Sequence, residues 1–134
     1  MPFKFGKIST EKLNEVNPVL KDLAIRALAK SSVDFGIPTT GGKRTAEEQK
    51  ALFDKGYSKA DGTLKKSYHQ SGNAVDLVPV IDGAMTWESK KAFTDINKAV
   101  MAAWAEMKIT DWTLTWGGTW TTFVDLPHYE LKKK

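Results

Sequence analysis

The segment Ser67-Tyr68-His69-Gln70-Ser71-Gly72-Asn73-Ala74-Val75-Asp76 is the part of the sequence on which the predicted fold depends. It contains His69, one of only two histidines in the chain, and it ends with the carboxylate of Asp76. The second histidine, His128, lies near the C-terminal end of the sequence, in the segment Asp125-Leu126-Pro127-His128-Tyr129-Glu130. Imidazole and carboxylate groups act together only when they are close in space. We therefore predict that folding brings these two distant segments together.

These three side chains are a sufficient set of protein ligands for a catalytic zinc ion. Zinc bound by two imidazoles and one carboxylate keeps a fourth position for water, and it lowers the pKa of that water to about 7. The chain has no cysteine, which excludes disulfides, thiolate nucleophiles and cysteine-based zinc sites. The alternative is that both histidines are structural, because a single His-x6-Asp spacing also arises by chance. We favour the metal site, since each histidine has an aspartate and a glycine or proline in its own segment.

Length and composition are those of one globular domain, and we expect a single domain over residues 1–134. Hydrophobic residues make up 41% and charged residues 27% of the 134 residues, and no apolar run approaches the ~18 residues that a membrane span needs. Residues 1–7 lack the apolar stretch of a secretory signal, so we expect synthesis in the cytosol. The net charge of +4 and the tail Lys132-Lys133-Lys134 suit an anionic partner such as nucleic acid, a membrane or an acidic polymer. A solvated lysine tail explains this charge equally well.

Hydrophobic spacing and capping residues predict both helices and strands. Helices are predicted at residues 9–16, 17–30, 45–56 and 86–107, and the first three begin at the N-caps Ser9, Asn17 and Thr45. Strands are predicted at residues 34–40 (an edge or extended segment), 74–80, 112–116 and around 129–131. A surface loop is predicted at 57–66, and a turn at Asp82-Gly83. No repeat, linker or second domain is visible in this order of elements.

Carboxylates beside the two histidines have distinct predicted roles. Asp76 falls inside the apolar strand 74–80, and a buried carboxylate is costly unless it is paired or bound to a metal. Hydrolysis of an amide also needs a base that takes a proton from water and passes it to the leaving nitrogen. Asp125 is the nearest candidate, because a proline keeps the intervening backbone extended. Glu130 is the rival base, but on a strand it shares a face with His128 and can instead orient that imidazole.

Arg44 and three tryptophans each have two possible roles. Arg44 follows a glycine pair at the start of a helix, where a fixed guanidinium can hold a carboxylate or a developing oxyanion. It is otherwise a surface arginine beside a capping box. Trp116 and Trp120 flank another glycine pair, and they either wall a substrate groove or fill the core. We assign Trp112 and Trp116 to the core, and we leave Trp120 open between core and groove.

Four groups of residues follow one another along the chain in the order and with the spacing of one known family. They are Gly42-Lys43-Arg44-Thr45 with Glu48-Gln49, Ser67-Tyr68-His69 with Gly72, Ala74 and Asp76, Trp116-Gly117-Gly118 with Trp120, and Asp125-Leu126-Pro127-His128. This set, spread over residues 38–131, resembles the D-alanyl-D-alanine carboxypeptidase/L-alanyl-D-glutamate endopeptidase family of zinc peptidases. The small size and the opening Phe3-Lys4-Phe5-Gly6-Lys7 are most similar to the single-domain endolysins of tailed phages.

The resemblance implies a compact, single-domain α+β fold with a small antiparallel sheet packed with helices, as in hedgehog and DD-peptidase-like domains. It also implies one Zn²⁺ ion, a general base and substrate-binding residues. The implied metal ligands are His69, Asp76 and His128, the base is Asp125, and the substrate-binding residues are Arg44 (also catalytic), Ser67 and Trp120. Two positions depart from the family, Tyr57 where a basic residue is common and Thr119 where an aspartate is common. These departures, with a short loop between Tyr57 and Ser67 that we expect to open the groove, concern the substrate more than the metal.

The resemblance implies an endolysin that hydrolyses the L-alanyl-D-glutamate bond of the peptidoglycan stem peptide and leads to lysis of the host cell. The alternatives are a D-alanyl-D-alanine carboxypeptidase or dipeptidase, and a non-catalytic cell-wall binding module on the same scaffold. Asp125 argues against the last, because a pure binding module has no use for a base there. We expect a monomer that contacts the anionic cell envelope, with no nucleic-acid partner and no transmembrane segment. It is expected to be made in the host bacterial cytoplasm and to act on the cell wall after release.

Overall fold

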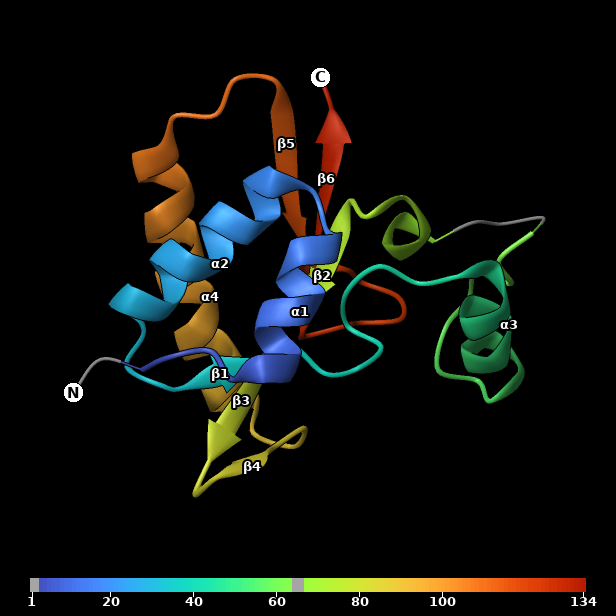
Figure 1. Cartoon of the computed structure of the whole chain (residues 1–134), viewed down its shortest axis with the longest axis horizontal. Coiled ribbons are helices and arrows are strands. Elements are labelled where there is room, and N and C mark those ends of the chain that lie inside the picture. The colour runs from blue at the N-terminus through green and yellow to red at the C-terminus, as the bar shows by residue number, and fades with distance from the viewer. Residues whose placement is uncertain (1–2, 64–66) are drawn as a thin grey trace.

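Helices and short antiparallel strands make up the computed structural model of the chain, which describes residues 3–63 and 67–134 (Figure 1). The helices are α1 (Lys7–Glu15), α2 (Pro18–Lys30), α3 (Ala46–Asp54) and α4 (Lys90–Met107), with two short 3-10 helices, η1 (Tyr68–Ser71) and η2 (Gly117–Thr119). The strands are β1 (Phe35–Gly36), β2 (Ala74–Asp76), β3 (Val78–Ile81), β4 (Ala84–Met85), β5 (Trp112–Trp116) and β6 (His128–Lys133). This is the α+β class that the sequence predicted. No helix in the described part of the chain is long and apolar enough to cross a membrane.

The strands form two antiparallel sheets in the described residues. One sheet has the order β2-β6-β5, and the other has the order β1-β3-β4. In the first sheet, Asp76 at the end of β2 is paired directly with His128 at the start of β6. The pairing of two strands that are far apart in the sequence therefore places two of the three predicted ligands side by side.

The hydrophobic core joins α2 and α4 to the sheet β2-β6-β5. Figure 1 shows α2 and α4 side by side next to β5 and β6, whereas α3 lies apart from them, beyond β2. The buried face of α2 is the stripe that the sequence predicted, Leu20, Leu23, Ala24, Ala27 and Leu28. Ile96 and Val100 of α4 and Tyr129 and Leu131 of β6 belong to the same core. Each buried leucine, isoleucine or valine among them stabilises the fold by about 1.5–3 kcal/mol relative to an exposed one, and this packing fixes β6 and the histidine at its start.

Capping residues set two helix starts as the sequence predicted. Asn17 Oδ1 accepts a hydrogen bond from the Val19 N–H at 2.9 Å and begins α2. At the start of α3, Thr45 and Glu48 form both hydrogen bonds of a capping box, each at 3.0 Å. Gly56 follows the end of this helix with a φ of 80°, a conformation that glycine adopts without strain. Local chemistry alone therefore fixes these boundaries.

The prediction that Ser9 is an N-cap is wrong. Helix α1 begins at Lys7, with Gly6 as its N-cap, so Ser9 lies inside the first turn. The buried Ser9 hydroxyl instead accepts a hydrogen bond from the Ile37 N–H at 2.9 Å. This bond satisfies a backbone donor next to β1 and ties that segment to α1. A tertiary contact, which no local pattern reveals, determines the use of this serine.

Two further boundaries differ from the prediction. The predicted strand 74–80 is split into β2 and β3, which belong to different sheets. The Leu77 N–H between them donates to the Pro127 carbonyl at 2.9 Å, so the chain changes sheets there. The long helix begins at Lys90, later than predicted, because the backbone of Ser89 is extended and its side chain caps the first turn. Of the predicted loop 57–66, residues 64–66 lie outside the described residues.

Candidate active site

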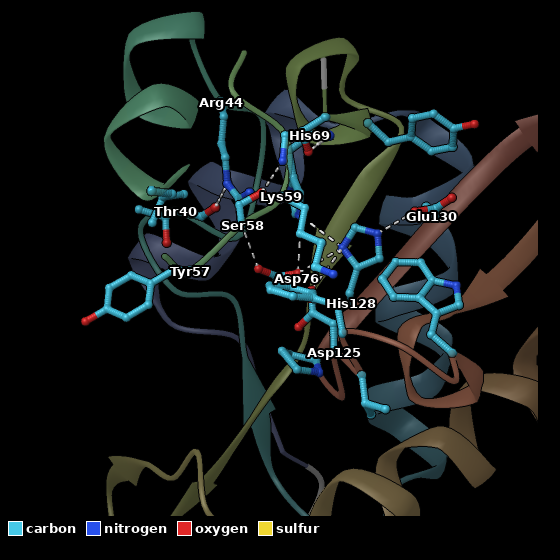
Figure 2. Close-up of a pocket in the computed structure, with 18 of the residues that line it drawn as sticks. Thr40, Arg44, Tyr57, Ser58, Lys59, His69, Asp76, Asp125, His128 and Glu130 are labelled. Carbon is cyan, nitrogen blue, oxygen red and sulfur yellow. Dashed lines mark hydrogen bonds and ion pairs between the residues drawn. The ribbon is translucent and has the colours of Figure 1, made fainter. Parts of the chain in front are cut away.

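The three predicted ligands come from three elements and converge in the interior (Figure 2). His69 lies on η1, Asp76 on β2 and His128 on β6, with exposed fractions of 1%, 7% and 6%. His69 Nε2 is 3.2 Å from His128 Nδ1 and 3.2 Å from Asp76 Oδ1, and His128 Nδ1 is 3.5 Å from the same oxygen. Atoms bound to one tetrahedral zinc at about 2.0–2.1 Å lie roughly 3.3 Å apart. The observed separations match that spacing.

The remaining ring nitrogens of both histidines are held by acceptors. His69 Nδ1 is 2.9 Å from the Gly42 carbonyl oxygen, which can only accept, so this nitrogen carries the proton. His128 Nε2 is 2.7 Å from Glu130 Oε1 and donates to it. Each ring therefore directs its other nitrogen toward the space between the two histidines and Asp76. Metal-bound histidines are held in the same way. Glu130 is thus placed as the residue that orients His128.

One carboxylate oxygen of Asp76 accepts a hydrogen bond, and the other lies beside the two imidazoles without one. Its Oδ2 accepts a hydrogen bond from Arg44 Nη2 at 3.1 Å, whereas the buried Oδ1 has no hydrogen-bond partner among the described residues. Burial raises the pKa of Asp76, but the two imidazoles outweigh it and hold the pKa well below its usual range. A buried, ionised oxygen without a donor is costly, and a cation between Asp76, His69 and His128 removes that cost. These residues therefore fit a metal ion.

The two imidazoles differ in their proton affinity. Burial lowers the pKa of His69, which keeps this ring neutral as a ligand must be. Burial also disfavours the charged form of His128, but the nearby carboxylates of Asp76 and Glu130 outweigh it and raise the pKa of His128 to about 9. The position next to His128 Nδ1 thus stabilises a cation, and a metal that binds there displaces a proton.

Asp125 lies beside the ligands without joining them. Its Oδ2 is 3.9 Å from His128 Nδ1, and its backbone N–H donates to the Gly117 carbonyl at 3.1 Å. A Cβ at Gly117 would lie 2.3 Å from the Asp125 carbonyl oxygen, so only glycine permits this close approach. Burial, with the nearby charge of Asp76, raises the pKa of Asp125 to about 6. A carboxyl group that titrates near neutral pH can both accept and return a proton.

Arg44 is anchored by three hydrogen bonds. Its Nε donates to the Thr40 carbonyl at 2.6 Å, its Nη1 to Gln49 Oε1 at 3.0 Å and its Nη2 to Asp76 Oδ2 at 3.1 Å. Burial lowers the pKa of Arg44, and the charge of Asp76 opposes this shift. Three of the five guanidinium N–H groups are therefore committed, and two remain for a substrate. The arrangement fixes the outer oxygen of Asp76 and leaves the inner one directed at the two imidazoles.

All seven predicted site residues line one cavity of about 1000 Å³. They are Arg44, Ser67, His69, Asp76, Trp120, Asp125 and His128. The Ser67 hydroxyl accepts a hydrogen bond from the His69 N–H at 3.2 Å and caps η1. The half-buried Trp120 ring lies 5.2 Å from the His128 ring, centroid to centroid, which resolves its open assignment toward the groove. Trp112 and Trp116 are packed against the core as predicted, and Trp116 stacks on Tyr129.

Comparison with known proteins agrees with this geometry. The model of one family, described as phage L-alanyl-D-glutamate peptidase, matches residues 1–133. The chain belongs to this family. The L-alanyl-D-glutamate peptidase of Escherichia phage T5 is 36% identical over 133 residues, which cover 99% of this chain and 92% of that protein. The peptidoglycan L-alanyl-D-glutamate endopeptidase CwlK of Bacillus subtilis (strain 168) is 30% identical over 129 residues, 88% of this chain and 74% of CwlK.

A solved structure has the same fold. The crystal structure of the Serratia marcescens L-Ala D-Glu endopeptidase ChiX superposes with a TM-score of 0.80 at 31% identity, covering 96% of this chain and 90% of that one. The family that the motifs resemble and the predicted fold class are thereby confirmed.

Two contributors to the site have roles that the sequence did not indicate. Gln49 is completely buried and bonds Arg44 as well as the loop that follows α3. Gly42 supplies the carbonyl that fixes the His69 tautomer. Both residues belong to the motifs that carry the family resemblance, and that is the one signal that marks them. Gln49 bonds Ser58 and Ala60 in the loop after α3, and Gly42 bonds His69, which lies 27 residues further along the chain.

Proposed function

We propose that the protein is a zinc-dependent endopeptidase that cleaves the L-alanyl-D-glutamate bond in the stem peptide of bacterial peptidoglycan. The observation that carries the proposal is the convergence of three buried ligand atoms, one from each of His69, Asp76 and His128, within 4.8 Å of one another. Membership of the phage L-alanyl-D-glutamate peptidase family supports the peptidase activity and the substrate. The ligand set supports zinc, because two imidazoles and one carboxylate are typical of catalytic zinc sites.

The side chains around the ligands divide the chemical work. Zinc, when bound, supplies a Lewis acid and makes a water molecule more acidic. Asp125 Oδ2 accepts a proton from the attacking water and returns it to the leaving nitrogen, as its position beside His128 allows. Arg44 holds Asp76 and has two N–H groups left for the substrate, and Ser67 and Trp120 line the same cavity. Glu130 keeps His128 in the orientation that binding requires.

The biological setting is part of the same proposal. The protein acts as a monomeric endolysin, is made in the host bacterial cytoplasm, and reaches the cell wall after release. Its net charge of +4 supports adsorption to the anionic cell envelope. Lysis of envelope preparations is therefore expected to weaken as salt rises, because exposed charges are screened over about 10 Å at 0.1 M. Cleavage of a short soluble stem peptide should depend on salt much less, and equal sensitivity of both would contradict the adsorption step.

Mass analysis of fragments released from purified peptidoglycan tests the activity. The expected products carry a new N-terminal D-glutamate, disappear when a chelator is added and return when zinc is restored. Release of terminal D-alanine without internal cleavage would favour the carboxypeptidase alternative. Binding to peptidoglycan without any product from the zinc-loaded protein would favour a non-catalytic module.

A further inference from the structure

A second positively charged side chain, Lys59, lines the pocket. The residues on either side of it are hydrogen-bonded to the buried Gln49. The Gln49 side-chain amide donates to Ser58 Oγ at 2.7 Å and to the Ala60 carbonyl at 2.8 Å. The Ala60 N–H also donates to Ser58 Oγ at 3.2 Å, and Ala60 is buried. The backbone on both sides of Lys59 is therefore anchored, whereas the Lys59 side chain is exposed and lines the cavity.

The same glutamine links this segment to the ligand cluster. Gln49 Oε1 accepts a hydrogen bond from Arg44 Nη1, and Arg44 Nη2 donates to Asp76. A continuous chain of hydrogen bonds thus runs from Asp76 through Arg44 and Gln49 to the residues next to Lys59. Since Gln49 is fully buried, the position of the Lys59 backbone relative to the ligands is set by the fold rather than by the loop alone.

Lys59 is available for a ligand, in contrast to Arg44. Within residues 3–63 and 67–134, the Lys59 ammonium group lies 5.5 Å from the centre of the Phe123 ring and forms no ion pair with a carboxylate. Figure 2 shows its side chain projecting across the pocket. Arg44 and Lys59 are the two Lys or Arg side chains among the described residues that line this cavity, and Arg44 is committed to Asp76. An anionic group of a substrate in the groove can therefore pair with Lys59 more readily than with Arg44.

The substrate of the proposed reaction carries such an anion next to the bond that is cut. Glutamate has two carboxyl groups, and its amino group forms the scissile amide with alanine. When one carboxyl group continues the peptide, the other remains ionised on the residue that leaves with the scissile nitrogen. We propose that Lys59 pairs with this free carboxylate and so favours a residue that carries one on the leaving side of the bond. This inference rests on the proposed endopeptidase function.

Two synthetic stem peptides that differ at one group test the inference. One carries the free glutamyl carboxylate, and its twin carries a carboxamide there. The unmodified zinc-loaded protein is expected to cleave the carboxylate peptide with a kcat/KM about 10-fold above that of the carboxamide twin, as one hydrogen bond to a charged group provides. Lys59→Met should lower kcat/KM for the carboxylate peptide by about the same factor and affect the twin much less, so that the preference disappears. Lys59→Arg should restore most of it.

Lys55→Met is the matched control, because it removes the same charge from an exposed residue at the end of α3 that does not line the cavity. This variant should keep the preference. If Lys59→Met reduces cleavage of both peptides equally, Lys59 does not bind the carboxylate and the inference is wrong. The inference is also wrong if Lys55→Met abolishes the preference for the carboxylate peptide. If the unmodified protein cleaves neither peptide, the proposed function itself fails, and the assignment of Lys59 falls with it.

Discussion

The pocket has two regions that are built in different ways. The floor consists of His69, Asp76 and His128, which are nearly inaccessible to solvent. Each of these side chains also has a further partner in Gly42, Arg44 or Glu130. The rim consists of Tyr57, Trp87, Phe123 and Val124, whose side chains are 71%, 53%, 39% and 55% exposed.

This difference separates chemistry from recognition. Each side chain of the floor is held in one orientation, because it contacts another residue in addition to the other two floor residues. The rim is apolar surface that the fold leaves in water, and grouped exposed apolar side chains mark binding surfaces. We therefore expect changes in the floor to abolish metal binding or turnover, and changes in the rim to alter substrate affinity alone.

The largest effect is expected from removal of a floor ligand. In His128→Ala, two ligands remain, so zinc content should fall from one per chain to a small fraction and hydrolysis should be lost. Asp76 and Glu130 also each lose one partner, which should lower the stability of the variant. Metal analysis, circular dichroism and peptide hydrolysis measure these three effects. A full zinc equivalent bound to the folded variant would show that the ligand assignment is wrong.

The metal ion can be removed without changing the chain, which gives a second test of the same site. Chelation of the unmodified protein should abolish hydrolysis and leave the fold in place, because the core of α2, α4 and β6 does not depend on the site. Addition of zinc should then restore activity. Loss of the folded state on chelation would mean that the metal is structural.

Asp125→Asn should separate the base from the ligands. The change is nearly isosteric, so zinc content and thermal unfolding should remain close to normal. The amide cannot accept a proton at neutral pH, and turnover should therefore fall by roughly 10²–10⁴-fold. The loss should appear in kcat more than in KM, because the group acts in the reaction and not in binding.

Glu130→Gln is the matched comparison for Asp125→Asn, since it makes the same change in a carboxylate on the other side of His128. Glu130 bonds the ring nitrogen that faces away from the cluster. Its replacement should weaken zinc affinity by about 10–100-fold and reduce turnover mainly through metal loss. If excess zinc does not rescue Glu130→Gln, while Asp125→Asn turns over normally, Glu130 is the base.

The floor could be predicted from sequence to a large extent, and the reason is local. His69 and Asp76 are seven residues apart in one segment, and with two histidines in the chain the second ligand segment was already defined. The side chain of Asn17 and the capping box at Thr45 fix helix starts by contacts within a few residues. Contacts of this kind can be predicted from sequence because both residues lie within the same short segment.

The rest depends on contacts between distant residues. The pairing of Asp76 with His128 comes from the register of β2 and β6, two strands that lie far apart in the sequence. The break at Leu77 requires an acceptor on Pro127, which lies 50 residues later. Gln49 looks like an ordinary helical residue, yet its partners are in the loop after α3. Apart from the contact of Glu130 with His128, which the sequence suggested, the contacts that orient the ligands were thus the part that sequence patterns could not show.

The electrostatics of the floor predict a pH-dependent stability of the metal-free protein. Burial alone would lower the pKa of His128, but the nearby carboxylates of Asp76 and Glu130 raise it to about 9, above about 6.5 in the unfolded chain. The folded state therefore binds this proton more tightly, and the stabilisation is full below pH 6.5 and lost as pH rises through about 9. The free energy of unfolding should fall by up to about 3 kcal/mol over this window.

Denaturant unfolding of the chelated protein at several pH values between 6.5 and 9.5 measures this change. The zinc-loaded protein is the control, because its His128 is deprotonated in the bound state and should show no such loss in this window. A metal-free protein whose stability is constant or rises across the window would contradict the charge arrangement around His128.

The smallest effect is expected at the rim, in Tyr57→Ala. Tyr57 is 71% exposed and lines the cavity, so its removal should change stability by no more than about 0.5 kcal/mol. If the ring packs against the substrate, KM for a stem peptide should rise by about 2- to 10-fold, the value of one aromatic contact, with kcat and zinc content unchanged. Phe53→Ala is the matched control, because Phe53 is an exposed aromatic residue of α3 that does not line the cavity. A change in zinc content or a fall in kcat in Tyr57→Ala would mean that floor and rim are coupled, and the separation of chemistry from recognition would then fail.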